Sequence, residues 1–357
     1  MKKKILIILA VFLGLSFLLS SCMPGPRVVG TPGVSVSKDK VVVAYGTSVF
    51  GIDIQNGAVL WHYPEKASAQ RVFYAKPLIT DDAVYIGDFE NSFHKLDLET
   101  GTEKWSFTDA KGYFTGQAAI DGDRVYAPSN DGNLYALDQN GDLLWKFSAE
   151  HYIWAQPQFS ADRIFVGSTD HFVYALLMDG KEIWSREMAG AIVDTPVLSE
   201  DGSVLYVGSM GKEMVALDTT TGDILWTFDS NGNLQSVWGS AVLVNNTLIF
   251  ADSAGKIFGL DPDNGEPVWQ TEVAGSVVGG LAAMKDGFVL ATKEGLVKAF
   301  DAMGTPLWEA TLDGEIYNAP AVNDEYVVVG TLKGSNLLYA FNTKGVQIWS
   351  TTPENKR

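Results

Sequence analysis

The sequence contains one cysteine, Cys22, and only four histidines among its 357 residues. A single cysteine excludes a disulfide bond within the chain, even in an oxidising compartment. The histidines are His62, His94, His151 and His171. Their spacing fits neither an H-E-x-x-H motif nor another close ligand pattern, so no zinc site is indicated. We expect each histidine to lie at the surface or at the edge of a sheet.

Basic residues are also few. The chain has 26 Lys and Arg against 43 Asp and Glu, which gives a net charge of −17. Beyond Lys4 there is no cluster of Lys or Arg, whereas proteins that bind nucleic acid need a basic face. An anionic membrane surface would repel so acidic a chain. We therefore expect no nucleic acid partner, and contact with a membrane only through an anchor.

The motifs of common enzyme classes are missing as well. The sequence has no P-loop, no G-x-S-x-G and no dinucleotide-binding fingerprint. The stretch Asp261–Gly265 is similar to a calcium loop, but its glycine comes one place early and the distal glutamate is missing. We interpret it as an ordinary turn. The sequence thus predicts no catalytic residue and no metal site.

The only apolar run long enough to suggest a targeting segment lies at the amino terminus. Three lysines at positions 2–4 precede an apolar run at 5–19, which is short for a transmembrane span and predicts a secretion signal over residues 1–21. Its end, Leu19-Ser20-Ser21-Cys22, resembles the lipobox of bacterial lipoproteins, in which the cysteine is acylated. We expect lipidation of Cys22 and a flexible tether over residues 22–27. An ordinary cleaved signal with an incidental cysteine is the alternative.

Tryptophan recurs at a regular spacing through the rest of the chain. Eight tryptophans lie 39 to 44 residues apart, and each has a glycine four positions before it. They are Trp61, Trp105, Trp145, Trp184, Trp226, Trp269, Trp308 and Trp349. A period near 41 in a sequence of short β-type runs is typical of propeller blades. We predict an all-β fold, an eight-bladed β-propeller of four-stranded antiparallel blades, as one domain over residues 28–357.

The repeated residues have interpretable places in each unit. An Asp, or Asn342 in the last unit, begins the turn before the outer strand and can accept hydrogen bonds from backbone N–H groups two residues on. The glycine supplies a positive φ later in the same turn. Leu177 interrupts this pattern in the fourth unit, so we expect a less well tied turn there. The tryptophan then lies on the outer strand, where its ring can cover the joint between neighbouring sheets.

The repeat resembles a known motif. The stretches 135–145 and 215–226 resemble the tryptophan-docking motif of pyrroloquinoline-quinone-like (PQQ-like) propeller repeats. With its lipobox and single domain, the chain is similar to the BamB family of outer-membrane barrel-assembly lipoproteins. The resemblance implies a non-catalytic scaffold that binds envelope proteins, including the barrel-assembly machinery, as a monomer within a complex. It implies a place on the periplasmic face of an outer membrane, or at the cell surface where the organism has none.

Quinoprotein dehydrogenases have similar docking tryptophans but also carry an adjacent cysteine pair and calcium-binding carboxylates. This chain has only Cys22, which the predicted lipid uses. The resemblance therefore does not imply the quinone, and we expect no cofactor and no enzyme activity.

A second aromatic pattern appears in the residue just before each predicted first strand. Five of the eight positions are aromatic: Tyr74, Phe114, Trp154, Trp238 and Tyr317. First strands begin at one rim of the central channel, so these side chains should converge there. One hypothesis is a binding site for peptides, glycans or small molecules, because polar residues lie among the aromatics. The other is a hydrophobic ring that closes the hub.

Overall fold

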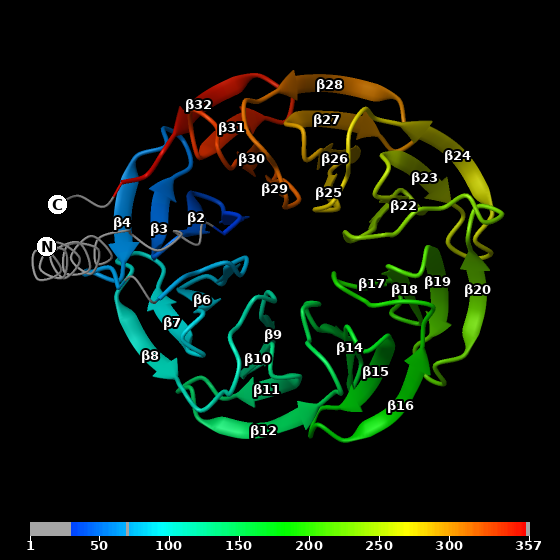
Figure 1. Cartoon of the computed structure of the whole chain (residues 1–357), viewed down its shortest axis with the longest axis horizontal. Helices are drawn as coiled ribbons and strands as arrows, with labels where there is room; N and C mark the ends of the chain where they lie inside the picture. Colours follow the sequence, from blue (N-terminus) through cyan, green and yellow to red (C-terminus); the bar gives the residue numbers. More distant parts are fainter. Residues whose placement is uncertain (1–29, 69–70, 355–357) are drawn as a thin grey trace, which may run out of the picture.

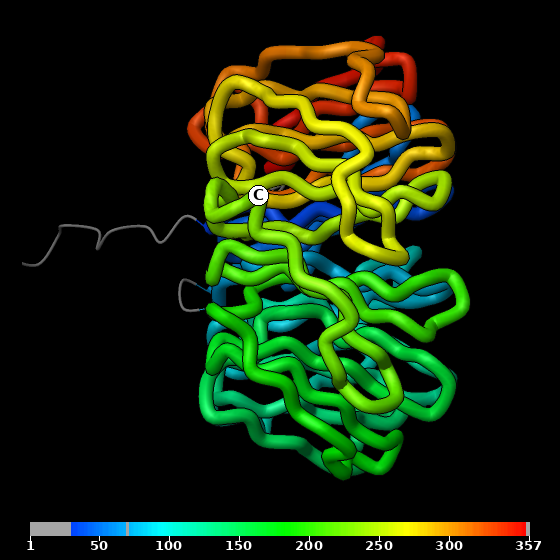
Figure 2. Tube along the Cα trace, turned by 90° about the vertical axis from the view of Figure 1, so that its right-hand side faces the viewer, coloured from blue at the N-terminus to red at the C-terminus, as the bar shows by residue number. Residues whose placement is uncertain are grey.

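The computed structural model describes residues 30–68 and 71–354, so the signal 1–21, the tether 22–27 and Cys22 lie outside the described residues. The described part forms eight four-stranded antiparallel sheets around a central axis (Figure 1). From the side, the ring is a shallow cylinder (Figure 2). This confirms the all-β, eight-bladed propeller that the tryptophan spacing predicts.

Each blade consists of four consecutive strands, with the first nearest the axis and the fourth at the rim. Blades one to four contain β1 Gly33–Val36, β2 Lys40–Tyr45, β3 Ser48–Asp53, β4 Val59–Tyr63, β5 Leu78–Ile79, β6 Ala83–Gly87, β7 Phe93–Asp97, β8 Glu103–Phe107, β9 Ala119–Asp121, β10 Arg124–Pro128, β11 Asn133–Leu137, β12 Leu143–Ser148, β13 Gln158–Ser160, β14 Arg163–Gly167, β15 Phe172–Leu177 and β16 Glu182–Glu187. Blades five to eight contain β17 Val197–Leu198, β18 Val204–Ser209, β19 Glu213–Asp218, β20 Ile224–Phe228, β21 Val242–Val244, β22 Thr247–Ala251, β23 Lys256–Leu260, β24 Pro267–Glu272, β25 Leu281–Met284, β26 Gly287–Ala291, β27 Leu296–Asp301, β28 Pro306–Thr311, β29 Ala321–Val322, β30 Tyr326–Gly330, β31 Leu338–Asn342 and β32 Gln347–Thr351.

The core lies between the blades. The two middle strands of each blade are rich in β-branched and aromatic residues and are buried almost throughout, because both faces of the sheet pack against neighbouring blades. In blade five, for example, Leu205 on β18 and Val215 on β19 pack against Phe165 and Val173 of blade four. The hydrophobic core is therefore a ring of inter-blade clusters.

Each docking tryptophan crosses to the next blade. Its indole N–H donates a hydrogen bond to a backbone carbonyl in the turn before the next outer strand. The pairs are Trp61 and Leu98 (2.9 Å), Trp105 and Gln139 (2.8 Å), Trp145 and Met178 (3.1 Å), Trp184 and Thr219 (3.2 Å), Trp226 and Pro262 (2.9 Å), Trp269 and Ala302 (3.0 Å), Trp308 and Thr343 (3.0 Å), and Trp349 and Ile54 (2.7 Å). The hydrogen bond fixes the ring across the joint.

The repeated glycine has a second role beside its positive φ. Gly222 has φ +74°, and a Cβ placed on it would lie 2.6 Å from the Trp184 ring of the preceding blade. All eight turn glycines receive an indole in this way. The strand residue opposite the tryptophan is Gly or Ala in every blade except the second, where Lys95 faces Trp105. Small residues on both sides thus make room for the ring.

The ring closes without exchange of strands between the chain ends. Trp349 of blade eight docks on Ile54 of blade one, as the other tryptophans do on their neighbours. The amide N–H groups of Asn318 and Asn323 donate to the carbonyl oxygens of Pro32 and Ser37, at 2.8 and 2.7 Å. Figure 1 shows β32 beside β4. Within residues 30–68 and 71–354, the hydrogen bonds that join blade eight to blade one are therefore made by side chains to backbone carbonyls.

The turn at Leu177, which lacks the Asp or Asn of the other turns, is held by other hydrogen bonds. The Leu177 N–H donates to the Lys181 carbonyl at 2.8 Å, and the Asp179 carboxylate accepts from the Lys181 N–H at 3.2 Å. The corresponding turn of blade five has two bonds of 2.8 Å to the Asp218 carboxylate. A carboxylate two residues later thus replaces the missing one.

Candidate functional site

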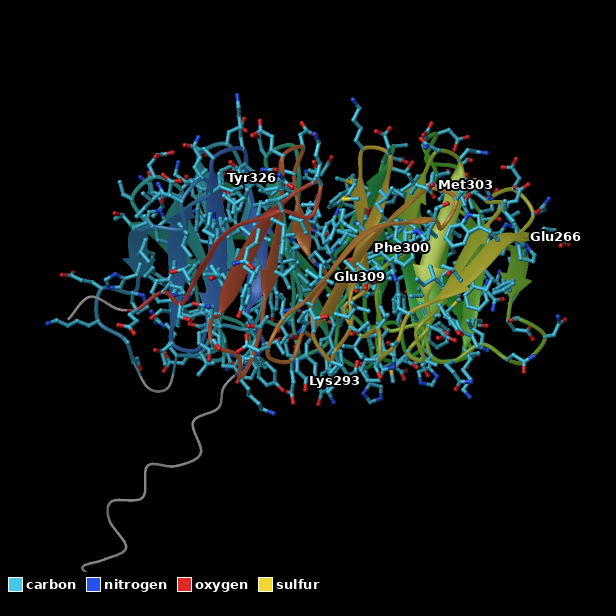
Figure 3. All side chains as sticks on the ribbon, turned by 90° about the horizontal axis from the view of Figure 1, so that it is seen from above. Glu266, Lys293, Phe300, Met303, Glu309 and Tyr326 are labelled. Carbon is cyan, nitrogen blue, oxygen red and sulfur yellow. The ribbon has the colours of Figure 1, made fainter. Side chains whose placement is uncertain are left out.

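The innermost strands and the residues that precede them enclose a cavity of about 1000 Å³ on the axis. Tyr317, which lines this cavity, lies near the turn between β26 and β27. There the Lys293 ammonium lies 5.5 Å from the centre of the Tyr317 ring. Figure 3 labels Lys293 at one face of the ring, with Met303 and Tyr326 near the opposite one. The cavity is larger than a second pocket of about 370 Å³, which lies near Lys95 and Trp105 of blade two.

Four of the five aromatic residues predicted at the channel line this cavity. They are Tyr74, Trp154, Trp238 and Tyr317, from blades two, four, six and eight. Trp154 and Trp238 keep 37% and 40% of their surface exposed, so they are not packed as core residues are. The ring of aromatics is therefore open to the channel at these positions.

Phe114 does not line the cavity, and its prediction as an interaction residue is corrected. Its side chain is 1% exposed and packs on Phe93 and Tyr135. It occupies the buried place that Phe73 and Ile153 hold in the adjacent blades. Successive side chains of an extended segment point to opposite sides. An alignment that is wrong by one residue therefore takes a side chain that faces the core for one that faces the channel. At the position of blade three that corresponds to Tyr74 and Trp154, Thr115 lines the channel.

Phe89, which the sequence analysis missed, and Tyr152, a neighbour of Trp154 in the sequence, extend this surface. Phe89, in the turn between β6 and β7, lies between the rings of Tyr74 and Tyr113, with centroids 4.4 and 4.3 Å away. Tyr152 stacks on Trp154 with 17° between the planes. Phe89 lies outside the aligned column, so only the fold could reveal it. Together these five residues form an aromatic ledge on blades two to four.

Amide side chains line the channel below the ledge. Gln117 donates its N–H to the Pro77 carbonyl at 3.2 Å, and Gln156 donates to the Ala118 carbonyl at 2.8 Å. Asn130 instead accepts from the Trp154 indole at 3.2 Å, which fixes the orientation of that ring. The amides therefore join adjacent blades and present polar atoms to the cavity.

The lining has two charged side chains, Lys76 on blade two and Asp194 on blade five. Burial lowers the pKa of Lys76, while the charge of Asp194 opposes this shift. Burial raises the pKa of Asp194 against hydrogen bonds that its carboxylate accepts from the Thr195 and Ser240 N–H groups, at 2.7 and 2.9 Å. The lining thus has no net charge in a strongly acidic protein.

A separate ionic cluster lies between blades one and two. His94 is buried on β7, where its ring nitrogens lie 3.0 Å from Asp88 and 2.9 Å from Glu103, and Arg71 pairs with Asp88 at 3.1 Å. Burial alone would lower the pKa of His94, but the two carboxylates raise it. The Glu103 carboxylate also accepts a hydrogen bond from the Tyr63 hydroxyl, and its pKa falls to about 2, chiefly through His94. The expectation of an exposed histidine is therefore wrong for His94.

Among the described residues, no group of three or more His, Cys, Asp or Glu side chains could hold a metal ion. Pyrroloquinoline quinone is a tricarboxylate that is bound with calcium, whereas the channel offers one lysine opposite one aspartate. These residues do not fit the quinone. The described ranges also contain no helix that is long and apolar enough to span a membrane.

Comparison with known proteins relates the chain to one family. The family described as outer membrane protein assembly factor BamB matches residues 21–150, 131–277 and 274–356. The BamB of Nitrosomonas eutropha is 34% identical to this chain over the part that aligns. That part is 39% of this chain, and the chain spans about a third (34%) of that relative's length. The BamB of Shewanella oneidensis is 21% identical over 83% of this chain and 68% of its own. The match extends through nearly all of the propeller.

Solved structures show the same fold. BamB from Moraxella catarrhalis has a TM-score of 0.72 at 20% identity and covers 86% of this chain and 92% of its own. A europium-containing methanol dehydrogenase has a TM-score of 0.68 at 16% identity, with coverage of 85% and 83%. The fold thus also occurs in an enzyme, and the family is decided by sequence. Since its model matches the chain from residue 21 to 356, the protein belongs to the family of the outer membrane protein assembly factor BamB.

Proposed function

We propose that the protein is a lipid-anchored, non-catalytic scaffold that binds proteins of the barrel-assembly machinery at the periplasmic face of an outer membrane. Its relatives are named as outer membrane protein assembly factors, which supports this role. The lipobox at Cys22 supports the anchor. We infer that partner proteins bind at the outer strands of the blades.

The outer strands present aliphatic side chains to solvent. In every blade except the second, the residue before the docking tryptophan is an exposed aliphatic one. These residues are Leu60, Leu144, Ile183, Leu225, Val268, Leu307 and Ile348. Among the described strands, each outer strand pairs on one side only, so its other edge presents backbone N–H and C=O groups that no described strand pairs with. Such an edge is a template for a strand of another protein.

Among these edges, β20 is the one that we propose as the docking strand. It reads ILWTF, so it contains no charge, and Ile224 and Leu225 are 49% and 52% exposed. Edge strands are usually protected by charged residues or proline. Blade two has that protection, because Lys104 replaces the aliphatic residue and pairs with Asp97 at 2.9 Å. β20 is therefore suited to an extended, apolar segment of a partner.

The experiment compares Leu225→Lys with Val268→Lys, on full-length protein in cells that have the assembly machinery. Val268 has the same place on β24, a strand that begins at Pro267 and carries Glu272. We expect Leu225→Lys to lose the assembly proteins that crosslink to and copurify with the parent, and Val268→Lys to retain them. Equal recovery with both variants would refute docking at β20. Absence of assembly proteins from the parent's crosslinks would refute the function itself.

The anchor is tested separately. We expect Cys22→Ser to leave the protein unlipidated and to move it from the membrane fraction to the soluble periplasmic fraction. Mass spectrometry of the mature amino terminus measures the lipid directly. Persistence of the variant in the membrane fraction, together with an unmodified Cys22 in the parent, would refute the anchor.

A further inference from the structure

The central channel has features of a ligand site that scaffold binding at the rim does not use. Its lining combines aliphatic residues with polar and aromatic ones and has no net charge, although the chain as a whole has a charge of −17. Its volume of about 1000 Å³ is at the upper end of the range for ligand pockets. A hub that only closed the ring would be filled by apolar side chains. The composition of the lining therefore needs another explanation.

The amides of the lining have unused hydrogen-bond acceptors. Gln117, Gln156 and Asn318 each bond to a backbone carbonyl of a neighbouring blade. A carbonyl can only accept, so the amide nitrogen makes this bond and the amide oxygen is left over. No described residue donates to these three oxygens. They come from blades three, four and eight and so surround the channel with acceptors.

Lys76 adds a donor to the same ring. It holds the position in blade two that Gln117 and Gln156 hold in blades three and four. No described residue accepts a hydrogen bond from its ammonium group, whereas the opposite charge, Asp194, already accepts from two backbone N–H groups. A polar group in such a place is costly unless a ligand or water binds it.

The aromatic rings are placed as platforms. Trp154 is held by Asn130, whose oxygen also accepts from the Thr115 hydroxyl at 2.7 Å. Trp238 lines the channel and precedes β21 of blade six, which lies across the ring from blade two, where the ledge begins (Figure 1). The faces of aromatic rings carry partial negative charge and attract C–H groups of partial positive charge. The hydroxyl-bearing rings of sugars have such C–H faces.

We propose that the channel binds an uncharged oligosaccharide. Sugar hydroxyls would donate to the amide oxygens of Gln117, Gln156 and Asn318, and one would accept from Lys76. The sugar rings would stack on Trp154 and Trp238. A peptide is the competing ligand, because it brings both carbonyl acceptors and N–H donors, and the experiment compares the two. A charged polymer is disfavoured by the neutral lining. This inference goes beyond the scaffold function and does not depend on it.

The test uses purified full-length mature protein with neutral tetrasaccharides as probes: maltotetraose, cellotetraose and tetra-N-acetylchitotetraose. An uncharged tetrapeptide with blocked ends is the competing probe, and calorimetry measures affinity. We expect at least one sugar to bind at millimolar concentration or below, more tightly than the peptide. Failure of all three sugars, or tighter binding of the peptide, would overturn the proposal.

Variants locate the site. Trp154→Ala should weaken sugar binding about fivefold to tenfold, while Trp154→Phe should restore most of it. Lys76→Met should also weaken binding, and Lys344→Met, at an exposed turn of blade eight, should not. Thermal unfolding of each variant is measured beside binding. If Trp154→Ala binds like the parent and only melts at a lower temperature, the ring is a hub core and the proposal is wrong.

Discussion

Substitution of one turn glycine by alanine tests the docking mechanism directly. Gly222 has φ +74°, and an added Cβ would lie 2.6 Å from the ring of Trp184. The left-handed backbone costs an alanine about 1–2 kcal/mol. The displaced indole adds an overpacking cost of about 1–3 kcal/mol. We expect Gly222→Ala to lower the free energy of unfolding by about 2–5 kcal/mol.

Gly122 provides a matched control for the backbone term. It also has a positive φ, +55°, but nothing lies within 4 Å of the Cβ that alanine would add. Gly122→Ala should therefore show only the backbone cost, about 1–2 kcal/mol. The difference between the two variants isolates the clash with the indole.

A double-mutant cycle with Trp184→Leu completes the test. Once the indole is removed, Gly222→Ala should cost no more than Gly122→Ala does. Urea unfolding, followed by circular dichroism so that the loss of a tryptophan does not change the signal, measures all variants. If Gly222→Ala and Gly122→Ala are equally destabilised, or if the cost at Gly222 is unchanged without the indole, the docking argument is refuted.

Two further predictions concern pH and closure. Since the folded pKa of His94 is raised above its ordinary 6.5, its contribution to stability is complete below pH 6.5 and is lost as the pH rises through the folded value. The melting temperature should therefore fall over that window in the parent and change less in His94→Gln; parallel curves would contradict this. Deletion of residues 310–357 removes blade eight and leaves Gly57 without Trp349, so the whole ring should lose its fold in one step. A truncated protein that melts at the parental temperature would show that closure is unnecessary.

The architecture was predictable because its determinants repeat. One tryptophan and one glycine recur in every blade, and eight copies of a local pattern outweigh the ambiguity of any single strand. The receiving partner was not predictable from one unit, because Trp184 meets Gly222 of the next blade, 38 positions later. Periodicity therefore reveals which residues matter, while the contact between units needs the fold.

The channel was predictable only in outline. Trp154 and Trp238 were found because they lie outside the docking period, but Phe114 was misplaced because its flanking residues, Tyr113 and Thr115, allow two alignments. The polar partners of His94, which are Asp88, Glu103 and Tyr63, were hidden for a different reason. They come from a turn, an outer strand and the previous blade, and no spacing in the sequence marks that convergence.

The order of the strands in each blade has a consequence for how the chain folds as it is made. Because every described blade is built from four consecutive strands, each sheet can be completed as soon as its fourth strand has been synthesised. The docking tryptophan of that blade then needs only the turn before the outer strand of the next blade, so the blades can assemble in the order of synthesis. The turn glycine of blade one, Gly57, has no indole to pack against until Trp349 of blade eight has been made. In this order of assembly, the last step of folding is the docking of blade eight on blade one.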